Sequence, residues 1–552
     1  MNLYYKILLY ILALLPYVFS LPLDVIDIDT AQYAEIAREM VETGDYFHLK
    51  DNGKKYLDKP ILTFWTIAAF YKLFGISEFS FRLPALLALL IGSFSVGYTT
   101  FLISGNQYRG YLASLIYISI PGTFSIVLNP LIDIYLCMYL NLVHLTYYLG
   151  MKKNSKWYYL MYWFIGMGFI TKGPISAVIP AISIGGDILF RRDWNRLKEI
   201  KLWIGIPIAL VLPLFWSYLL LEEYSVYGPY FFFWQQSFGR FYDKMYNQKF
   251  DPFYFYKTLL WGLFPISGFL LYLIYKNISL FFKTNKPFFQ TITNKWKNDW
   301  REKDFVIGFW IFLFIFLISF SKFQLPQYTY WVLGGGCIFL AQNLSYFTER
   351  NFSLWKKLFF YFPSIVLLSF VFISPFIIID TNIFYWLTSV LVLGIGIILF
   401  LKTKEIVLIN LIPMYSAMLV VSLFIFPELL KYQPSKQIGK IIQELEPNKS
   451  FFYSFGLSHS KRSYEFYSKR LMRNLFDKSQ LEQELKTGEF RLVVTPMEYY
   501  SFLIEKVQGS FKYEIIEDKL SYKIATPTQK FLKKKTRQNA VSHIYLVKLT
   551  KL

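Results

Sequence analysis

Carboxylates and lysines gather in one polar stretch of an otherwise apolar chain, at residues 22–81. Asp29 stands directly before an amphipathic segment at 30–43 that is expected to be helical. An acid in this place can serve as a general base or orient an acceptor. It can also be an N-cap, with Gln32 closing a capping box. The two roles are compatible because an N-cap carboxylate is rigidly held, so we predict that Asp29 belongs to a catalytic centre.

The same stretch contains an acid, a lysine and a proline in succession, at Asp58, Lys59 and Pro60. Proline favours the first position of a helix, so the three residues are consistent with a simple turn and helix start. They also suit an anionic substrate, because Lys59 would bind a phosphate and Asp58 would orient Lys59. Both are catalytic candidates, and Tyr33 on the preceding helix is a candidate substrate contact.

Further charged residues stand at the ends of apolar segments later in the chain. Asp133 starts one such segment, and Lys172 precedes a glycine and a proline that start another. A lysine there commonly extends to lipid headgroups, and an acid at a helix start complements the helix dipole. The alternative is an anion site made by Lys172 and the free amides of the next helix. Lys322, Tyr328 and Arg240 stand in two other links and are candidate phosphate or substrate contacts.

The chain has too much apolar surface for a soluble protein. Of its 552 residues, 55% are hydrophobic and 21% aromatic, and the mean hydropathy is +0.35. These values are typical of a protein that crosses a membrane many times. The net charge of +21 does not indicate nucleic-acid binding, because most basic residues stand in short loops between apolar segments. The two cysteines stand inside apolar segments, so no disulfide is predicted. The four histidines form no close pair, so no histidine-built metal site is predicted, and a divalent metal on other ligands is left open.

The apolar segments predict about 13 membrane spans. We expect them at 3–21, 82–103, 110–127, 131–149, 157–171, 174–190, 201–221, 255–275, 304–320, 328–345, 355–378, 384–401 and 406–426. The shorter apolar segment 61–74 is expected to lie at the membrane interface. Arginine and lysine are concentrated in alternate loops, which places the N-terminus inside and the candidate residues outside.

The composition becomes more polar near residue 431. Strand-like segments stand at 451–456, 491–496 and 543–549, with helical patterns near 435–445 and 478–486 between them. We therefore predict a mainly α, polytopic membrane protein with two domains. Residues 1–430 would form the membrane domain with its external loop 22–81, and residues 431–552 a small soluble α/β domain on the outer face.

Five segments, in their order along the chain, resemble the polyprenyl-phosphate-dependent glycosyltransferases with the GT-C fold. They are DTAQYAEIAREMVETGDY, KYLDKPILTFW, LFGISEFSFRLPA, TKGP and SKFQLPQY. Within this fold, the segments look like those of the superfamily of the lipid A aminoarabinose transferase and the protein mannosyltransferases. The resemblance is specific from residue 20 to near residue 330, and in the C-terminal part it concerns the architecture alone.

The resemblance implies roles for the residues of the first loop. Asp29 matches the acid implicated in catalysis, and Asp58 and Lys59 match the acid–lysine pair before the proline. Two positions depart from the pattern of the relatives. Thr30 stands where many relatives have a second acid, which places a two-carboxylate mechanism in doubt, and Ile61 replaces a second proline.

The resemblance also extends to residues later in the chain. Asp133 and Lys172 match an acid and a lysine that line the same cavity, and Tyr328 matches the tyrosine of a late lysine-leucine-proline link. Gln324 replaces a common lysine and removes one phosphate contact. The loop 222–254 lacks the histidine that accompanies a metal in the aminoarabinose enzymes, so no bound zinc is carried over.

These observations together predict an inverting sugar transfer. The donor would be a sugar on a polyprenyl phosphate, and its lipid phosphate would leave as the acceptor attacks. Asp29 would take the acceptor's proton or orient an anionic acceptor. The growing negative charge would be stabilised by the lysines named above, with Arg82 or Arg240.

The acceptor stays open at this stage. Lipid A or another glycolipid is favoured, and a secreted protein is the alternative, as in the protein O-mannosyltransferases. Two readings without glycosyl transfer are a polyprenyl-phosphate transporter, which would need polar groups along a path through the membrane, and a binding protein with a relict site. The expected partners are thus the lipid-linked sugar, its acceptor and membrane lipid.

Overall fold

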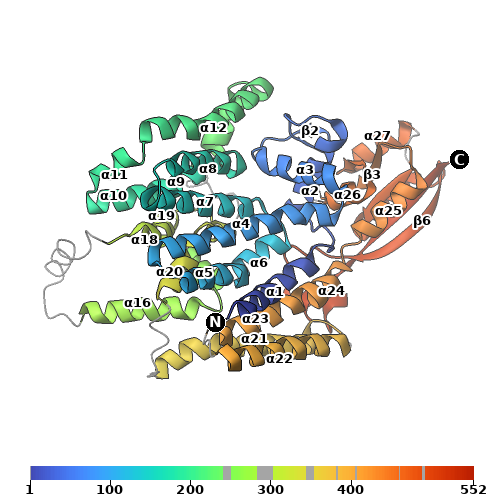
Figure 1. The fold of residues 1–552 in the computed structure, drawn as a ribbon. Coiled ribbons are helices and arrows are strands. Elements are labelled where there is room, and N and C mark those ends of the chain that lie inside the picture. Colours follow the sequence, from blue (N-terminus) through green and yellow to red (C-terminus); the bar gives the residue numbers. More distant parts are fainter. Residues whose placement is uncertain are drawn as a thin grey trace.

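The structure is a computed structural model that describes residues 2–239, 250–282, 303–343, 354–380, 383–403, 407–458, 461–487 and 491–552. Within these ranges the chain is mainly helical, with one five-stranded sheet near the C-terminus and one small hairpin. Figure 1 shows the long helices packed side by side and the sheet at one end of them. The N-terminal elements α2 and α3 lie beside this sheet, although they are far from it in sequence (Figure 1).

The longer helices of the apolar part are α1 (Leu3–Ser20), α4 (Glu78–Ser104), α5 (Gln107–Ser119), α7 (Ile132–Lys152), α8 (Trp157–Lys172), α12 (Leu202–Tyr224), α16 (Ser267–Phe282), α20 (Leu333–Asn343), α21 (Leu354–Ile377), α22 (Ile383–Thr403) and α23 (Leu408–Val420). Shorter helical pieces connect or extend them: α6 (Pro121–Leu128), α9 (Ile175–Pro180), η1 (Ala181–Gly185), α10 (Gly186–Arg191), α11 (Trp194–Glu199), α13 (Tyr227–Tyr230), η2 (Phe231–Gly239), α15 (Tyr254–Gly262), α18 (Val306–Gly308), η4 (Phe309–Leu313), α19 (Phe314–Ile318), η5 (Pro326–Val332), η7 (Val421–Ile425) and α24 (Phe426–Leu430).

Fewer helices than expected are long and apolar enough to cross a membrane. In the described part of the chain six helices meet this condition, and the pair α5 and α6, bent by 50°, would be a seventh. The prediction of about 13 spans is therefore not confirmed. Several predicted segments are divided into short pieces; the segment 174–190, for example, becomes α9, the π-helical η1 and α10.

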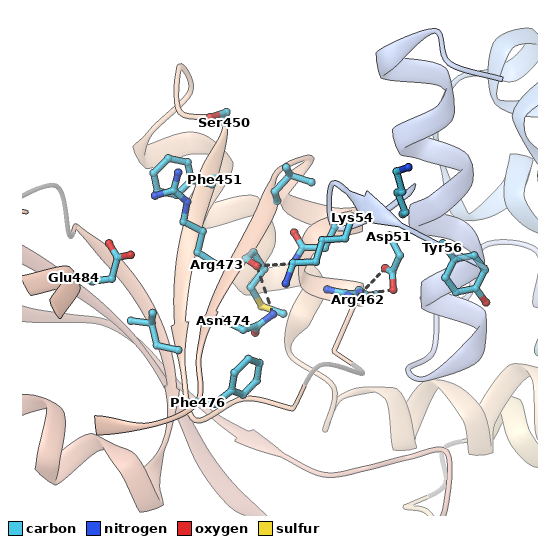
Figure 2. A pocket seen from close by; sticks show the side chains of 15 residues that line it. Asp51, Lys54, Tyr56, Ser450, Phe451, Arg462, Arg473, Asn474, Phe476 and Glu484 are labelled. Carbon is cyan, nitrogen blue, oxygen red and sulfur yellow. Dashed lines mark hydrogen bonds and ion pairs between the residues drawn. The ribbon is translucent and has the colours of Figure 1, made fainter. Parts of the chain in front are cut away.

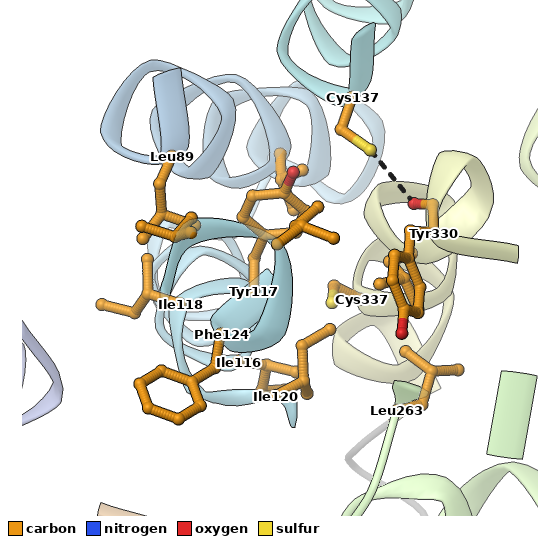
Figure 3. Close-up of a cluster of buried hydrophobic side chains, with 14 of the residues drawn as sticks. Leu89, Ile116, Tyr117, Ile118, Ile120, Phe124, Cys137, Leu263, Tyr330 and Cys337 are labelled. Atoms are coloured by element: carbon orange, nitrogen blue, oxygen red, sulfur yellow. Dashed lines mark hydrogen bonds between the residues drawn. The ribbon is translucent and has the colours of Figure 1, made fainter. Parts of the chain in front are cut away.

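The helix α7 is central, because it packs against both α4 and α8 and nearly all of its side chains are buried. Figure 3 shows part of the apolar core beside it, with Cys137 and Cys337 among aliphatic and aromatic side chains. Both thiols are free, and the Cys137 thiol donates to the carbonyl oxygen of Tyr330 at 3.3 Å. Neighbouring α4 and α5 approach closely at Gly97, where a Cβ would lie 2.8 Å from the Cβ of Ser114. This core holds the first turn of α7 at the site described below.

Residues 22–77, called the first loop region here, contain α2 (Asp29–Thr43), a hairpin of β1 (Lys50–Asp51) and β2 (Lys54–Lys55), and α3 (Leu62–Phe74). Gly44 ends α2 with a φ of 71°, a left-handed conformation that glycine adopts without strain. The helices lie where the sequence predicted them. Their apolar faces form a core of their own with parts of α12 and η2.

Residues 435–552, called the C-terminal sheet region, form a sheet with the strand order β4-β3-β5-β7-β6. Its strands are β3 (Phe451–Phe455), β4 (Leu471–Leu475), β5 (Leu492–Pro496), β6 (Phe511–Ser521) and β7 (Ser542–Lys551), and its helices include α25 (Ser435–Leu445), α26 (Ser463–Ser468), α27 (Lys478–Thr487), α28 (Met497–Val507) and α29 (Gln529–Leu532). The strands β3, β4 and β5 are parallel, whereas β7 is antiparallel to both of its neighbours. The sequence indicated β3, β5 and β7 and missed β4 and β6.

Candidate active site

Asp29 is the first residue of α2, and its side chain is exposed. The N-cap is Ile28, which makes no side-chain capping bond, so the predicted capping box is wrong. The amide of Gln32 instead donates to Oδ2 of Asp51 in the hairpin, at 2.8 Å. Thr30, which replaces the second acid of many relatives, donates its hydroxyl to Asn129. A negative charge in the first turn is favoured by the helix dipole, so Asp29 is well placed to act as an anion.

The chain just before Asp29 is held by the C-terminal sheet region. The N–H of Val25 donates to the Tyr467 hydroxyl at 2.8 Å, and the Val25 carbonyl accepts from the Gln433 amide at 2.7 Å. The Oε1 atom of Gln433 in turn accepts from the N–H of Asp27 at 3.1 Å. These bonds fix the backbone just before Asp29. The position of the Asp29 carboxylate therefore depends on residues that are more than 400 positions further along the sequence.

Asp27 has a different environment from Asp29, two residues further on. It is 4% exposed, its Oδ1 accepts from the N–H of Ser463 at 3.1 Å, and its Oδ2 lies 3.6 Å from Nζ of Lys461. Burial raises the pKa of Asp27, and the charge of Lys461 acts in the opposite direction. Asp27 is therefore a structural acid, whereas Asp29 is accessible.

A second group of polar side chains meets at the start of α7. Nζ of Lys172, at the end of α8, donates to Oδ1 of Asp133 at 2.5 Å, and the indole N–H of Trp331 donates to the same oxygen at 2.8 Å. The Lys172 ammonium also lies 5.3 Å from a ring centroid of Trp331 and 5.9 Å from that of Tyr328. The structure thus brings together Asp133, Lys172 and Tyr328, as the resemblance implied.

A cavity of about 460 Å³ opens beside this group. Lys172, Tyr328 and Trp331 line its polar end. Its remaining wall is mostly apolar and is made by residues of α9, η1 and α19 that include Ile175, Val178, Ile182, Phe314, Leu317 and Ile318. A cation beside an aromatic pair at the end of an apolar cavity suits a ligand with an anionic head and a hydrocarbon chain.

Tyr33 connects the two groups. Its phenol is 5% exposed, and its pKa is raised by burial and then by the negative charges of Asp29, Asp133 and Asp58. The three carboxylates therefore act on the same phenol, which lies between the first loop region and α7 in the effect of their charges.

Asp58 joins the same site through the residue Gln236 of η2. The Gln236 amide donates to Oδ1 of Asp58 at 3.0 Å, and Gln236 also lines the cavity of Lys172. Asp58 is exposed and Lys59 is partly buried beside it. Asp58 thus contacts a residue of the cavity wall, whereas neither Asp58 nor Lys59 lines the cavity itself.

The predicted substrate contact Arg82 lies elsewhere. Its side chain is fully buried, and its guanidinium donates to the backbone carbonyls of Leu128, Leu23 and Asp24, at 3.2 Å for Leu128 and 2.8 Å for Asp24. Backbone carbonyls use its donors, so the geometry gives Arg82 a structural role in joining α4, α6 and the start of the first loop region.

The other predicted contacts are not part of this group. Lys322 is exposed and does not line the cavity, and Arg240 lies outside the described residues. Gln324, which replaces a lysine of the relatives, is 3% exposed and exchanges two hydrogen bonds with the backbone of Asp251, at 3.1 and 2.8 Å. It is a tether between two segments rather than a phosphate contact.

Sequence reasoning missed Trp331 and Gln236. Neither is charged, and each is one aromatic or polar residue among many, so composition gives no signal for them. Trp331 stands three residues after Tyr328 on the same helical piece, and this spacing was the one sequence signal for its place in the site.

No group of three or more His, Cys, Asp or Glu side chains that could hold a metal ion is found among the described residues.

The fold and this site define a class of protein. The structure shares the GT-C fold of polyprenyl-phosphate-sugar glycosyltransferases, which the chain resembles. The sequence model of one family, dolichyl-phosphate-mannose-protein mannosyltransferase, matches residues 58–218, which include Asp58, Lys59, Asp133 and Lys172.

Particular relatives are found by sequence and by structure. The undecaprenyl phosphate-alpha-4-amino-4-deoxy-L-arabinose arabinosyl transferases of Yersinia enterocolitica and Serratia proteamaculans are 28% and 26% identical to it, over 54% of this chain and 52% of each relative. The chain thus spans about half the length of the relatives that it matches in sequence. The crystal structure of ArnT from Cupriavidus metallidurans bound to undecaprenyl phosphate has a TM-score of 0.73 at 18% identity, covering 98% of this chain and 97% of that one. This likeness shows a shared fold along the whole described chain.

Proposed function

We propose that this protein is an integral membrane glycosyltransferase. It moves a sugar from a polyprenyl-phosphate donor to an envelope acceptor, with lipid A or another glycolipid favoured, at the outer face of the inner membrane. The observation that carries the proposal is the Asp133–Lys172 pair with its aromatic neighbours at the polar end of an apolar cavity, beside the exposed acid Asp29.

The cavity accounts for donor binding. The prenyl chain would lie along the apolar wall, and the phosphate would lie at the polar end near Lys172 and Lys59. Asp133 holds the Lys172 ammonium in place before the donor binds, and the Trp331 indole N–H donates to the same carboxylate oxygen of Asp133. Such preorganisation matters because side chains that are already ordered need not reorganise as charge develops on the leaving phosphate.

Transfer then needs one displacement at the anomeric carbon. A bond forms between the acceptor oxygen and this carbon as the bond from the carbon to the phosphate oxygen breaks, and the electron pair leaves with the lipid phosphate. Asp29 takes the proton of an acceptor hydroxyl, or orients the acceptor when the attacking group is already an anionic phosphate. Attack from the face opposite the phosphate inverts the anomeric centre.

The relatives support the donor half of the proposal. Their named activity uses an undecaprenyl-phosphate-linked sugar, and the related crystal structure contains undecaprenyl phosphate. The orientation with the site outside is supported by the basic residues of the alternate loops. The matching mannosyltransferase model favours a protein acceptor as the second candidate. A transporter is disfavoured because the polar side chains described above gather at one end of the cavity.

Mass spectrometry of lipid A would test the proposal, in cells with the gene intact, deleted, or encoding Asp29→Asn. The expected result is the loss of a sugar-sized mass increment in both altered strains, which would also identify the sugar class. Unchanged lipid A would reject this acceptor, and envelope glycoproteins would be examined next. Full release of sugar from a polyprenyl-phosphate donor by purified, folded Asp29→Asn protein would reject the role of Asp29 as the base.

A further inference from the structure

A second cavity, of about 660 Å³, lies where the first loop region meets the C-terminal sheet region. Its walls come from the hairpin and from the edge strand β4 with its neighbour β3. Figure 2 shows side chains of both parts facing the space between them. The volume is typical of cavities that bind small organic groups. None of its lining residues takes part in the donor cavity.

The charges around this cavity favour an anion. Four cationic and two acidic side chains line it. The acid Asp51 is already paired with Arg462, whose Nε lies 2.7 Å from Oδ1 and whose terminal nitrogen lies 3.1 Å from Oδ2 (Figure 2). The other acid, Glu484, accepts from the Tyr453 hydroxyl at 2.9 Å. The remaining positive charge therefore exceeds the negative charge.

Two of the cations have donors to offer. The guanidinium of Arg473 on β4 lies over the ring of Phe451, 3.4 Å from its centroid, and one of its terminal nitrogens donates to the Tyr453 hydroxyl at 3.5 Å; both contacts orient the guanidinium without neutralising its charge. Lys54 in the hairpin is exposed, and the structure assigns no partner to its ammonium within the described residues. A ligand that bridges the hairpin and the strand would meet one cation from each side.

The uncharged lining suits a sugar rather than a bare ion. Tyr56 and Phe476 provide aromatic faces, and Asn52 and Asn474 provide side-chain amides. Aromatic surface and amide groups are what a hydroxyl-rich ring can pack against and bond to. Together with the cations they describe a site for a saccharide that carries phosphate or carboxylate groups.

The cavity is mechanically joined to the candidate active site. Asp51 on its wall accepts from Gln32, one turn after Asp29 on α2. The tip of the hairpin is fixed on both sides, because Glu39 of α2 accepts from the backbone N–H of Asn52 at 2.6 Å and the Asn52 amide donates to the carbonyl of Met472 at 2.7 Å. A group bound here is therefore held at a set position relative to the acid that would activate the acceptor.

We propose that this cavity binds an anionic saccharide group of the acceptor, apart from the oxygen that is glycosylated. The inference rests on the proposed function, because it assigns the acceptor of that same reaction a second contact. The cavity then contributes to the choice of acceptor, whereas the donor cavity sets the choice of donor.

The test uses full-length protein in nanodiscs and two probes: lipid A with both of its phosphates, and the same lipid A after enzymatic dephosphorylation. Binding is measured without donor, and transfer is measured with a polyprenyl-phosphate sugar. The variant Lys54→Gln/Arg473→Gln removes both cations. Its matched control, Lys512→Gln/Lys551→Gln, removes two exposed lysines from the far side of the sheet. A third variant, Arg473→Lys, keeps the charge.

Wild type and control are expected to bind phosphorylated lipid A about tenfold more tightly than the dephosphorylated form, because hydrogen bonds to charged groups contribute enough binding free energy for such a difference in affinity. The double variant should lose this preference and show a higher acceptor KM with an unchanged donor KM, and Arg473→Lys should keep part of it. Equal binding of the two lipids by wild type overturns the inference, as does a double variant that behaves like the control. A preference seen in wild type without any sugar transfer rejects the proposed function and leaves this site standing.

Discussion

The two halves of the candidate site are held in different ways. At the membrane side, Lys172 and Asp133 depend on each other, with one indole N–H as additional support, beside an apolar cavity. On the side of the sheet, the backbone before Asp29 is held by several neutral hydrogen bonds and one ion pair. The first arrangement concentrates charge where a substrate would need it. The second distributes its bonds, so it sets position and tolerates the loss of a single contact.

The largest effect is expected where the charges depend on each other. Lys172→Ala should lower turnover by about 10²–10³-fold, because it removes the ammonium that the proposed function assigns to the leaving phosphate. It should also destabilise the protein by about 3 kcal/mol, because the side chain of Asp133, which is 4% exposed, loses its counter-charge. Turnover and thermal unfolding in detergent measure the two effects.

The double variant Asp133→Asn/Lys172→Met is the control for this prediction. It removes both charges while the side-chain amide introduced at position 133 keeps an oxygen for the Trp331 indole, so stability should largely return and turnover should not. A double variant as unstable as Lys172→Ala would contradict the interpretation that an unpaired charge causes the loss.

The next comparison is between two acids of the same segment. Asp29→Asn should lower turnover by about 10²-fold, as expected for a lost general base, and leave the unfolding temperature unchanged because the side chain is exposed. Asp27→Asn should do the reverse and destabilise the protein by about 1–3 kcal/mol with a smaller loss of turnover, because a buried acceptor is altered. Single-turnover kinetics and thermal unfolding of the two variants decide between them; equal kinetic losses would show that the two acids do not differ in role.

A smaller effect is expected from the residue that holds both Val25 and Asp27. Gln433→Met keeps the shape of the side chain and removes two hydrogen bonds to the backbone before Asp29. We expect kcat to fall about tenfold with an unchanged donor KM, because the proposed base Asp29 would be misplaced while the cavity proposed for the donor stays intact. Gln437→Met, an exposed glutamine four residues on, is the control and should retain full kcat. A raised donor KM in Gln433→Met would contradict a pure positioning role.

The sequence predicted those site residues that stand in segments recognisable from the family pattern. Asp133, Lys172 and Tyr328 come from three distant links, and the order of these links within a family pattern placed them at one site. Arg82 shows the limit of this reasoning. A charged residue in such a segment has the same appearance in sequence whether it contacts a phosphate or, as here, three backbone carbonyls.

Contacts between distant parts of the chain could not be predicted. The hairpin meets β4 through Asn52 and Met472, which are separated by 420 positions, and no local pattern encodes such a pairing. The span count was not confirmed for a related reason. Hydropathy reports that a segment is apolar, but whether it forms one straight helix depends on interruptions such as the π-helical η1. Conversely, α2 and α3 were predictable because their periodicity and terminal glycines are local signals.

The smallest expected effect is a pH dependence of the contact between α2 and α26. Glu465 is fully buried, with the N–H of Met472 and the guanidinium of Arg462 donating to its two oxygens, at 2.9 Å each. Burial raises the pKa of Glu465 well above its ordinary value, and the negative charge of Glu35 on α2 raises it further. Glu35 is itself paired with Arg38, and the charge of Arg462 lowers the pKa of Glu465.

A pKa raised in the folded state stabilises the protein below the unfolded value of about 4.3, and this stability is lost as the pH rises through the folded pKa. The unfolding temperature should therefore fall in wild type as the pH rises above the unfolded pKa and fall less in Glu465→Gln, whose amide still accepts from Met472 and has no proton to lose. An identical slope in both proteins would show that Glu465 stays ionised beside Arg462 throughout, so that this half of the contact, like the Asp133–Lys172 pair, depends on a charge rather than on a proton.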